Sequence, residues 1–383
     1  MKKVLGITGI RSEYFLQRPI FQAIMDHPDL ELQLVVTGAH HSSLHGFTVE
    51  QVENDGFPII AKIENLILSD HDADRLRGAA IQLEQLVDVV DKLRPDWLLT
   101  PADREEAMTM ALCGAYLGTA TAHYAAGDRV VGNVDDMVRH AVSRLSHLLL
   151  TTHEDARQRL IHAGEEEWRV HNVGHSGLDR MRTAPQLSAS ELAEQLGVKS
   201  VKQPYLIVIQ HPLSSEIEES GRQMRATLEA VIESGMQVFI SYPNSDPGST
   251  QIIEVIEEFR SNPAINIFRN VPDTPFVNLL RGATALIGNS SMGLLEAPFL
   301  KLPAINVGKR QTARHHVSNV FFVSPERDEI LRTIRAIKDD PATRERIQNC
   351  DNPFGEGRTG EHVAQLLATT EINEKLLNKD LAY

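Results

Sequence analysis

Short hydrophobic runs alternate with amphipathic stretches along most of the chain. In the first half these runs predict strands at Lys3–Thr8, Leu32–Thr37, Trp97–Thr100, Ala120–Tyr124 and Leu148–Thr152. In the second half they predict strands at Tyr205–Gln210, Val238–Tyr242, Ile265–Phe268, Ala285–Gly288, Ala304–Val307 and Val320–Val323. Strands that alternate with helices are typical of a parallel sheet with crossover helices. The pattern therefore predicts an α/β protein with two series of strands.

Helical spacing fills several of the intervals between these strands. One helical face is formed by Leu83, Leu86, Val87, Val90 and Leu93, and Pro95 marks its end. A second face is formed by Ile330, Leu331, Ile334 and Ile337. The tail from Glu361 carries apolar residues at similar intervals, so we expect a terminal helix that packs on the first domain.

The length of 383 residues exceeds one ordinary hydrophobic core, since domains typically hold about 100–200 residues. The stretch Gly174–Val201, with its Gly, Ser and Pro residues, separates the two strand series. We therefore expect an N-terminal Rossmann-like domain over 1–177 and a C-terminal nucleotide-binding Rossmann-like domain over 178–365. The helix expected over 366–383 would pack back on the first domain.

Composition narrows the class of protein. A hydrophobic content of 42% and a charged content of 23% are those of a globular chain, and the net charge of −14 argues against nonspecific binding to nucleic acid or to an anionic membrane. No apolar run approaches the roughly 18 residues of a membrane span. Cys113 and Cys350 lie far apart and fit no metal or disulfide spacing. We expect a cytoplasmic protein, and the two cysteines indicate no metal site.

Two glycine turns follow predicted strands and open helices, which is where a ligand approaches the backbone and an anion is favoured. The first contains Gly9 and Arg11, and the arginine supplies a charged fork suited to phosphate. The second, Gly288–Pro298, offers Ser290 and Ser291 as hydrogen-bond donors to a diphosphate and Glu296 as an acceptor from ribose hydroxyls. Ordinary turn and N-cap geometry explains each stretch comparably well.

Acidic residues follow the ends of two predicted strands. Asp103 and Arg104 come after one strand and Asp128 after the next, where open α/β sheets place their ligands. A helix then starts near Asp135 and Asp136 and carries Arg139 a turn later, although capping explains those two acids about as well as catalysis does. In the second half, one strand ends at Gln210 and leaves His211 beside the expected ligand. The histidines at 40, 41, 45, 315 and 316 match no strong metal motif.

These stretches occur together with others in one collinear order. The others are Leu145-Ser146-His147, Asn172-Val173-Gly174, Tyr242-Pro243-Asn244 and Gly308-Lys309-Arg310-Gln311. The whole set resembles the hydrolysing UDP-N-acetylglucosamine 2-epimerases, which open sialic acid and related nonulosonate biosynthesis. The resemblance covers nearly the whole chain.

The resemblance implies two Rossmann-like domains facing across a cleft, as in glycosyltransferase-B folds. It implies removal of the C2 proton with anti elimination of UDP, followed by addition of water to the 2-acetamidoglucal. It implies a UDP-sugar substrate, no metal, no nucleic acid or membrane partner, and a homodimer. Its catalytic positions correspond to Asp103, Asp135 and His211. Its substrate-binding positions correspond to Arg11, Arg104, Asp136, Arg139, Ser290, Ser291, Glu296 and Arg310.

One departure from the family concerns the stretch after the strand Ala120–Tyr124. Where the family shows His-Ile-x-Gly-Gly-Glu with a glutamate or histidine at x, this chain has Ala125, and the final glutamate is replaced by Asp128. Either Asp128 takes over acid–base work, or the site handles a different sugar, with Tyr124 and Ala125 among the residues that select it. The family's Gly-Asp-Arg is altered as well, because Ala102 precedes Asp103.

Three other functions stay open at this point. A non-hydrolysing epimerase returns UDP to C1, but that branch shows Arg-Pro-Glu where this chain has Arg11-Ser12-Glu13. A glycosyltransferase of the same fold would need an acceptor. A non-catalytic nucleotide-sugar-binding protein is favoured by the missing carboxylate at Ala125 and disfavoured by the number of acids expected near the ligand.

Overall fold

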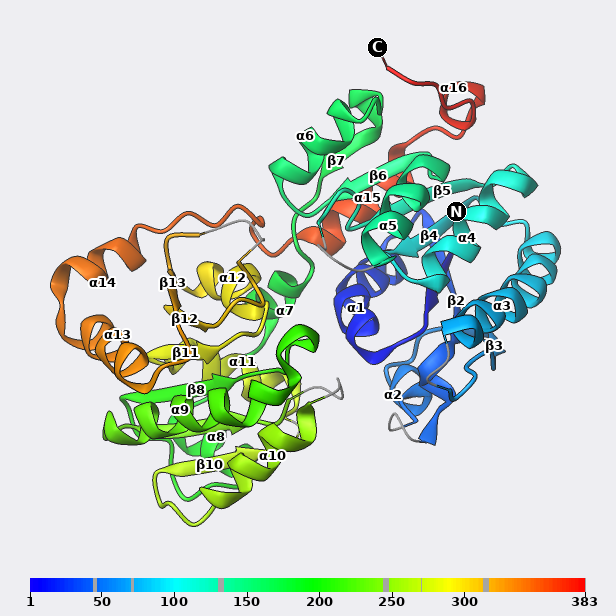
Figure 1. Cartoon of the computed structure of the whole chain (residues 1–383). Helices are drawn as coiled ribbons and strands as arrows, with labels where there is room; N and C mark the ends of the chain where they lie inside the picture. The colour runs from blue at the N-terminus through cyan, green and yellow to red at the C-terminus, as the bar shows by residue number, and fades with distance from the viewer. Residues whose placement is uncertain are drawn as a thin grey trace. The chain divides into compact units, whose positions relative to one another are not determined.

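The chain folds into two compact units. The computed structural model describes residues 1–43, 47–69, 72–129, 134–243, 248–269, 271–312 and 317–382 (Figure 1). Met1–Asp179 and Pro353–Tyr383 form one unit, here called unit 1, and Arg180–Asn352 forms the other, called unit 2. Each unit has its own parallel sheet.

The sheet of unit 1 has seven strands in the order β3-β2-β1-β4-β5-β6-β7, and every neighbouring pair is parallel. Its strands are β1 (Lys2–Thr8), β2 (Leu30–Thr37), β3 (Ile59–Ile63), β4 (Trp97–Pro101), β5 (Ala120–Tyr124), β6 (Leu148–Thr151) and β7 (Val170–Asn172). The central strands β4, β5 and β6 are buried along their whole length, as expected of a sheet covered on both faces.

Helices cover both faces of this sheet. The helices of unit 1 are α1 (Arg11–Asp26), α2 (Val49–Asn54), α3 (Asp72–Leu93), α4 (Glu105–Leu117), α5 (Val134–Leu145), α6 (Glu154–His162), α15 (Thr359–Thr369) and α16 (Glu374–Leu377), and α7 (Gly177–Thr183) crosses into unit 2. On one face α1 and α15 pack together, and on the other α3, α4 and α5 lie in sequence, each against the next. Successive residues of β1 face opposite sides of the sheet. Val4 therefore packs in the core beneath α1 and α15, and Leu5 packs in the core beneath α3 and α4.

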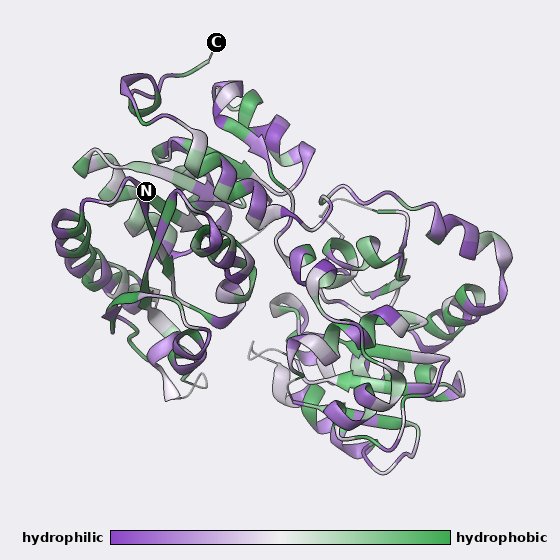
Figure 2. Cartoon of the chain, turned by 180° about the vertical axis from the view of Figure 1, so that it is seen from behind, coloured by the Kyte–Doolittle hydropathy of each residue, from purple (hydrophilic) through white to green (hydrophobic). Residues whose placement is uncertain are grey.

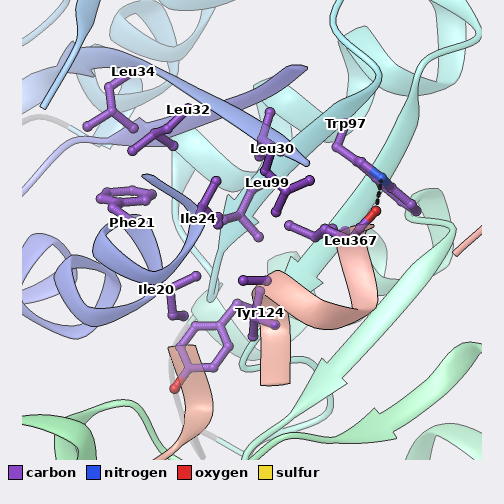
Figure 3. Packing of buried hydrophobic residues seen from close by; sticks show 14 of the residues in the cluster. Ile20, Phe21, Ile24, Leu30, Leu32, Leu34, Trp97, Leu99, Tyr124 and Leu367 are labelled. Carbon is purple, nitrogen blue, oxygen red and sulfur yellow. Dashed lines mark hydrogen bonds between the residues drawn. The ribbon is translucent and has the colours of Figure 1, made fainter. Parts of the chain in front are cut away.

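The core under α1 and α15 joins the two ends of the chain. Figure 3 shows Phe21 and Ile24 of α1 near the side chains of β2, Ile20 nearer to Tyr124 of β5, and Leu367 of α15 next to Trp97. The indole Nε1 of Trp97 donates to the Leu367 carbonyl at 3.0 Å. The terminal helix therefore completes the hydrophobic core of unit 1, as the apolar spacing of the tail predicts.

Two buried cations hold the rest of the tail in place. Arg169 is fully buried, and its guanidinium donates to the carbonyls of Leu376 at 2.6 Å and Lys375 at 2.8 Å, which α16 leaves unpaired at its end. Lys379 Nζ donates to the Ser143 and Ser146 carbonyls at the end of α5, at 2.7 and 2.8 Å. The final residues thus bind to the C-terminal end of α5.

The sheet of unit 2 has six parallel strands in the order β10-β9-β8-β11-β12-β13. Its strands are β8 (Tyr205–Ile209), β9 (Gln237–Ser241), β10 (Ile265–Phe268), β11 (Ala285–Gly288), β12 (Ala304–Val307) and β13 (Val320–Val323). Its helices are α8 (Ala189–Leu196), α9 (Ser220–Glu233), α10 (Ser249–Glu258), α11 (Asp273–Gly282), α12 (Met292–Leu295), α13 (Arg327–Asp339) and α14 (Pro341–Gln348).

Unit 2 repeats the three-layer arrangement. Residues of α9, α10 and α13 pack on one face of the sheet, and residues of α8, α11 and α12 pack on the other. The strands are hydrophobic along their length, whereas the helices turn polar faces outward (Figure 2). Among the described residues no helix is long and apolar enough to cross a membrane.

All eleven strands predicted from the sequence are present, and five of them have the predicted bounds. The pattern missed β3 and β7, which lie at the two edges of the unit 1 sheet. Each pairs on one side only, β3 exposes alternate residues and β7 has three residues, so neither needs a continuous hydrophobic run. The α/β prediction with two doubly covered sheets is confirmed.

The return of the chain to unit 1 begins earlier than expected. Residues 353–365, assigned above to the second domain, belong to unit 1. The Asp179 carboxylate accepts the backbone N–H groups of Thr359 at 3.0 Å and Gly360 at 2.7 Å, and Val363 lies in the unit 1 core. A start at 366 is therefore too late, because the first turn of α15 already carries contacts that the apolar spacing does not reveal.

Candidate functional site

Both sheets reverse their strand order at one point. In unit 1 the reversal lies between β1 and β4, and in unit 2 it lies between β8 and β11. Ligands of open α/β sheets bind outside the carboxyl ends of the strands at such a switch point. The candidate residues follow these four strands and the strands next to them.

The first glycine turn in unit 1 leads from β1 into α1. Arg11 is the exposed first residue of α1, and its guanidinium lies 5.3 Å from the centre of the Phe15 ring. Behind the turn, a Cβ atom on Gly9 would lie 1.8 Å from Oε1 of the buried Glu106. The chain therefore needs glycine there, because Glu106 occupies the space of a side chain.

Asp103 and Asp128 share one buried arginine. Arg139 is 6% exposed, and its Nη2 atom donates to Asp103 Oδ2 while its Nη1 atom lies 3.9 Å from Asp128 Oδ2. Asp103 follows β4, Asp128 follows β5, and Arg139 lies in α5. Three residues from separate elements are thus brought together at one edge of the sheet, as their strand-end positions predict.

The two carboxylates have different surroundings. Burial raises the pKa of Asp103 above its ordinary value, although Arg139 acts in the opposite direction. Asp128 accepts a hydrogen bond from Thr152 Oγ1 at 2.9 Å and lies 3.3 Å from Nδ1 of His153. Two carboxylates that share one arginine but differ in their other partners are an arrangement suited to acid–base chemistry.

Asp135 has a cationic partner that sequence reasoning missed. Arg75 of α3 donates from Nη2 to Glu105 at 3.0 Å and to Asp135 at 3.4 Å. Asp135 lies in the first turn of α5, and Asp136 beside it is 3.8 Å from Nε2 of His140. The two acids therefore do more than cap the helix, since each has a charged or titratable partner.

The turn that departs from the family has a strained backbone. Ala125 has φ of 57°, a left-handed conformation that favours glycine over residues with a Cβ atom. Tyr124 is 3% exposed, and its hydroxyl donates to Ser176 Oγ at 2.9 Å. Its side chain is committed to the core of unit 1, so the expectation that Tyr124 selects the sugar is wrong.

Two glutamates are buried beneath the first turn. Glu13 is 7% exposed and Glu106 is 3% exposed, and burial together with mutual repulsion raises the pKa of Glu13 well above its ordinary value. Burial also raises the pKa of Glu106, against the nearby Arg104, whose Nε lies 3.5 Å from Glu106 Oε2. Arg104, expected to bind substrate, thus contacts this buried pair.

In unit 2, His211 is fixed by the second glycine turn. The Asn289 side chain accepts the His211 backbone N–H at 2.7 Å and donates to the His211 carbonyl at 2.8 Å. Gly288 has φ of 127°, and a Cβ atom on it would lie 2.1 Å from the Ile209 carbonyl oxygen. The ends of β8 and β11 therefore meet closely, which places His211 beside the predicted diphosphate turn.

The other candidate residues of unit 2 surround the same turn. Ser290 and Ser291 precede α12, and both are partly exposed. Arg310, after β12, donates to the Asn289 carbonyl at 3.1 Å, and Gln311 donates to the same oxygen at 2.9 Å. This cluster presents hydroxyl groups and a guanidinium, which is the donor set that a diphosphate requires.

Glu296 is held by an arginine near the unit boundary. Arg180 donates to Glu296 Oε1 at 2.9 Å and to Asp273 Oδ1 at 3.1 Å. Glu296 is 6% exposed, so the pairing neutralises a buried carboxylate. Its second oxygen has the chemistry to accept from a hydroxyl, as expected above.

The structure groups the candidates by unit. Unit 1 contains Asp103, Asp128, Asp135, Arg139 and their neighbours, and unit 2 contains His211 and the diphosphate turn. Sequence reasoning missed Arg75, His153 and Arg180; of these, His153 follows β6 and had the strand-end signal. His45, Gly132, Asn133, Asn244, His315 and His316 lie outside the described residues. Within the described ranges no cluster of three His, Cys, Asp or Glu side chains is arranged to hold a metal ion.

Comparison with known proteins gives the same architecture. Hydrolysing UDP-N,N'-diacetylbacillosamine 2-epimerase of Legionella pneumophila is 31% identical over 383 residues, 100% of each chain. The GDP/UDP-linked counterpart of Campylobacter jejuni is 29% identical over 324 residues, 84% of each chain. A crystal structure of UDP-GlcNAc 2-epimerase from Neisseria meningitidis bound to UDP-GlcNAc has a TM-score of 0.79, covering 96% of this chain and 100% of that one, and at 18% identity the likeness is one of fold. The sequence model of a protein family described as UDP-N-acetylglucosamine 2-epimerase matches residues 22–368, and the chain belongs to this family.

Proposed function

We propose that the protein is a hydrolysing 2-epimerase of a UDP-linked 2-acetamido sugar. Its substrate is UDP-N-acetylglucosamine or the UDP-linked diacetamido sugar named for the Legionella relative. The products are UDP and the free 2-epimer, N-acetylmannosamine in the first case. The full-length similarity to hydrolysing relatives supports this branch over the non-hydrolysing one.

The reaction takes place in two steps. A base removes the proton from C2 while the C1–O bond breaks and UDP leaves, which gives a 2-acetamidoglucal. Water then adds across the double bond, with oxygen bonding to C1 and a proton returning to C2 from the opposite face. The sum consumes one water, and the site needs a base, an acid and donors for the departing diphosphate.

The acids of unit 1 supply the proton transfers in this proposal. Asp103, Asp128 and Asp135 are the acid–base candidates, and Arg139 keeps two of them at one place. Arg11, Arg104 and Asp136 are substrate-binding candidates from the same strand ends. The observation that carries the proposal is the Asp103–Arg139–Asp128 cluster, because one buried arginine holds two carboxylates together beyond the carboxyl ends of β4 and β5.

The turn of unit 2 binds the nucleotide in this proposal. Ser290, Ser291 and Arg310 hold the diphosphate, and Glu296 accepts from the ribose. His211, fixed by Asn289 next to that turn, acts on the leaving group or the sugar. A departing UDP would then stay bound to preorganised donors, which lowers the cost of the charge it develops.

The substitution at Ala125 bears on the choice of sugar. A carboxylate present in many members is absent here, and the Asp128 carboxylate lies next to Arg139 and Thr152. Asp128 therefore has the position and the partners to take over acid–base work. A non-catalytic sugar-binding protein is the second candidate, and only the missing carboxylate at Ala125 favours it.

The test is turnover without metal or acceptor. Purified protein is incubated separately with UDP-N-acetylglucosamine and with UDP-N,N'-diacetylbacillosamine, and free UDP and free sugar are followed by NMR. Release of UDP together with the 2-epimer supports the proposal and identifies the sugar. Formation of the UDP-linked epimer would point to the non-hydrolysing reaction, and UDP binding without turnover of either sugar to the binding protein.

Location and assembly are proposals of the same kind. We expect the protein in the cytoplasm, and the free thiols of Cys113 and Cys350, both buried, agree with a reducing compartment. We expect a homodimer, which light scattering on the purified chain measures directly.

A further inference from the structure

The turn that carries Asp103 is held by two buried side chains outside it. His123 of β5 has its Nε2 atom 2.6 Å from the Ala102 carbonyl oxygen, and its Nδ1 atom 3.0 Å from Ser143 Oγ of α5. His123 is fully buried and Ser143 is 1% exposed. Neither side chain is accessible to a substrate, so any effect on the reaction passes through Ala102 and its neighbour Asp103.

The contacts fix the protonation of the imidazole. Burial lowers the pKa of His123 to about 3, so the ring is neutral and carries one proton. A carbonyl oxygen only accepts, so that proton is on Nε2 and is donated to Ala102. Nδ1 is then an acceptor, and the Ser143 hydroxyl donates to it. The order of donation runs from Ser143 through His123 to Ala102.

The Ala102 backbone needs such support. Its φ is 30°, in the left-handed region where a Cβ atom is unfavourable and where the family carries glycine. Its N–H donates to the Tyr124 carbonyl at 2.9 Å, and its carbonyl accepts from His123. Both polar groups of the residue are therefore bound to β5, which opposes relaxation of the turn.

Helix α5 supports the same turn through two residues. Ser143 and Arg139 are four residues apart, on one face of the helix. Arg139 binds the Asp103 carboxylate directly, while Ser143 acts on the preceding carbonyl through His123. Lys379 of the tail binds the Ser143 carbonyl at 2.7 Å and fixes the end of this helix.

We propose that Ser143 and His123 are positioning residues that hold Ala102 in its left-handed conformation and so set the direction of Asp103. The inference rests on the proposed function, because it assigns the two residues to the reaction in which Asp103 takes part. Loss of the Ser143 hydroxyl removes the donor to Nδ1. The imidazole keeps its proton on Nε2, toward the Ala102 carbonyl, but the ring is then held from one side only and supports that carbonyl less firmly.

The variant that tests this is Ser143→Ala. We expect kcat to fall about tenfold with KM changed less than twofold, because binding groups elsewhere are untouched. Ser146→Ala is the matched control: Ser146 follows the same helix, is fully buried, and its Oγ has no hydrogen-bond partner in the described structure. Adding Ala102→Gly to Ser143→Ala should restore kcat to within threefold of wild type, since glycine adopts this φ without strain.

Three kinetic results would overturn the proposal. They are an unchanged kcat for Ser143→Ala, an equal loss of kcat in the Ser146→Ala control, and no recovery when Ala102→Gly is added. The nitrogen-15 shifts of His123 give a readout that needs no turnover. A neutral ring protonated on Nε2 in the wild type, with an Nδ1 shift that changes in Ser143→Ala as its hydrogen bond is lost, supports the inference. A charged ring or Nδ1–H in the wild type, or an Nδ1 shift unchanged by Ser143→Ala, overturns it. Absence of turnover by the wild-type protein would contradict the proposed function alone. The nitrogen-15 shifts would still decide whether Ser143 and His123 hold the Ala102 carbonyl.

Discussion

Asp103 is the residue whose substitution we expect to slow the reaction most. Replacement by Asn keeps the shape and the contact with Arg139 but removes proton transfer, which is worth about 10²–10⁴ in rate. We expect Asp103→Asn to lose kcat in this range while it still binds UDP, as measured by calorimetry.

A matched control is Asp88→Asn, which changes an exposed carboxylate on α3. We expect its kcat to equal that of the wild type. Equal turnover by Asp103→Asn and the wild type would remove Asp103 from the reaction.

Glu13 makes the stability of unit 1 depend on pH. Its pKa is raised well above the ordinary 4.5 in the folded protein, mainly by burial, so the native state binds more protons than the unfolded state. Stability from this group is complete below the unfolded pKa and is lost as pH rises toward the folded pKa, by at most about 1.4 kcal/mol per pH unit.

Glu13→Gln removes this titration without changing the shape. We expect its free energy of unfolding, relative to wild type, to rise between pH 5 and pH 8 in urea titrations. A difference that stays constant over this range would show that Glu13 is ionised in the folded protein.

Site residues were predictable from the sequence where they directly follow the ends of strands. Asp103 and Asp128 follow strand ends, and parallel strands bring such positions together. Arg75 and Arg180 reach their carboxylate partners across 30 and 116 residues, which no local spacing reveals. Tyr124 was misread because its strand-end position resembles that of a ligand-binding residue, whereas its hydroxyl is used by Ser176.

At the scale of elements, the terminal segment after α15 stabilises α5. Lys379 Nζ binds three carbonyls at the end of that helix and lies 2.7 Å from the buried carboxylate of Glu165. Lys379→Met removes this cation from the three carbonyls and leaves Glu165 paired with Arg144, 3.3 Å away, so we expect a part of the roughly 3–5 kcal/mol that breaking a buried pair costs. We expect a lower melting temperature for unit 1 by calorimetry.

The comparison variant is Lys92→Met, which changes an exposed lysine near the end of α3. Its melting temperature should match that of the wild type. If Lys379→Met melts at the wild-type temperature as well, the tail is not a stabilising element.

Strands were predictable from the sequence where they are buried on both faces of the sheet and so form a hydrophobic run. The strands β4 and β5 of unit 1 and β8 and β11 of unit 2 lie at or next to the two switch points, and burial on both faces makes each of them a mostly apolar run. The edge strands β3 and β7 lack such a run. The start of α15 depends on the Asp179 carboxylate, a partner 180 residues away, so its bounds were set too late.

For the whole molecule, the pattern of strands was sufficient to predict two α/β halves, and the structure has two parallel sheets with helices on both faces. The motifs, taken in order, were sufficient to predict the family. The choice of sugar was not predictable, because the relatives are named for different sugars and this chain departs from the family pattern at Ala125.

We expect the protein to exchange the C2 proton of the sugar and to hydrolyse the link to UDP. Incubation with the UDP-sugar in D₂O, followed by NMR of the free sugar, tests both steps at once. The expected products are free UDP and a 2-epimer that carries deuterium at C2. Release of UDP with an unlabelled sugar of unchanged configuration would contradict it, because simple hydrolysis at C1 leaves the C2 proton in place.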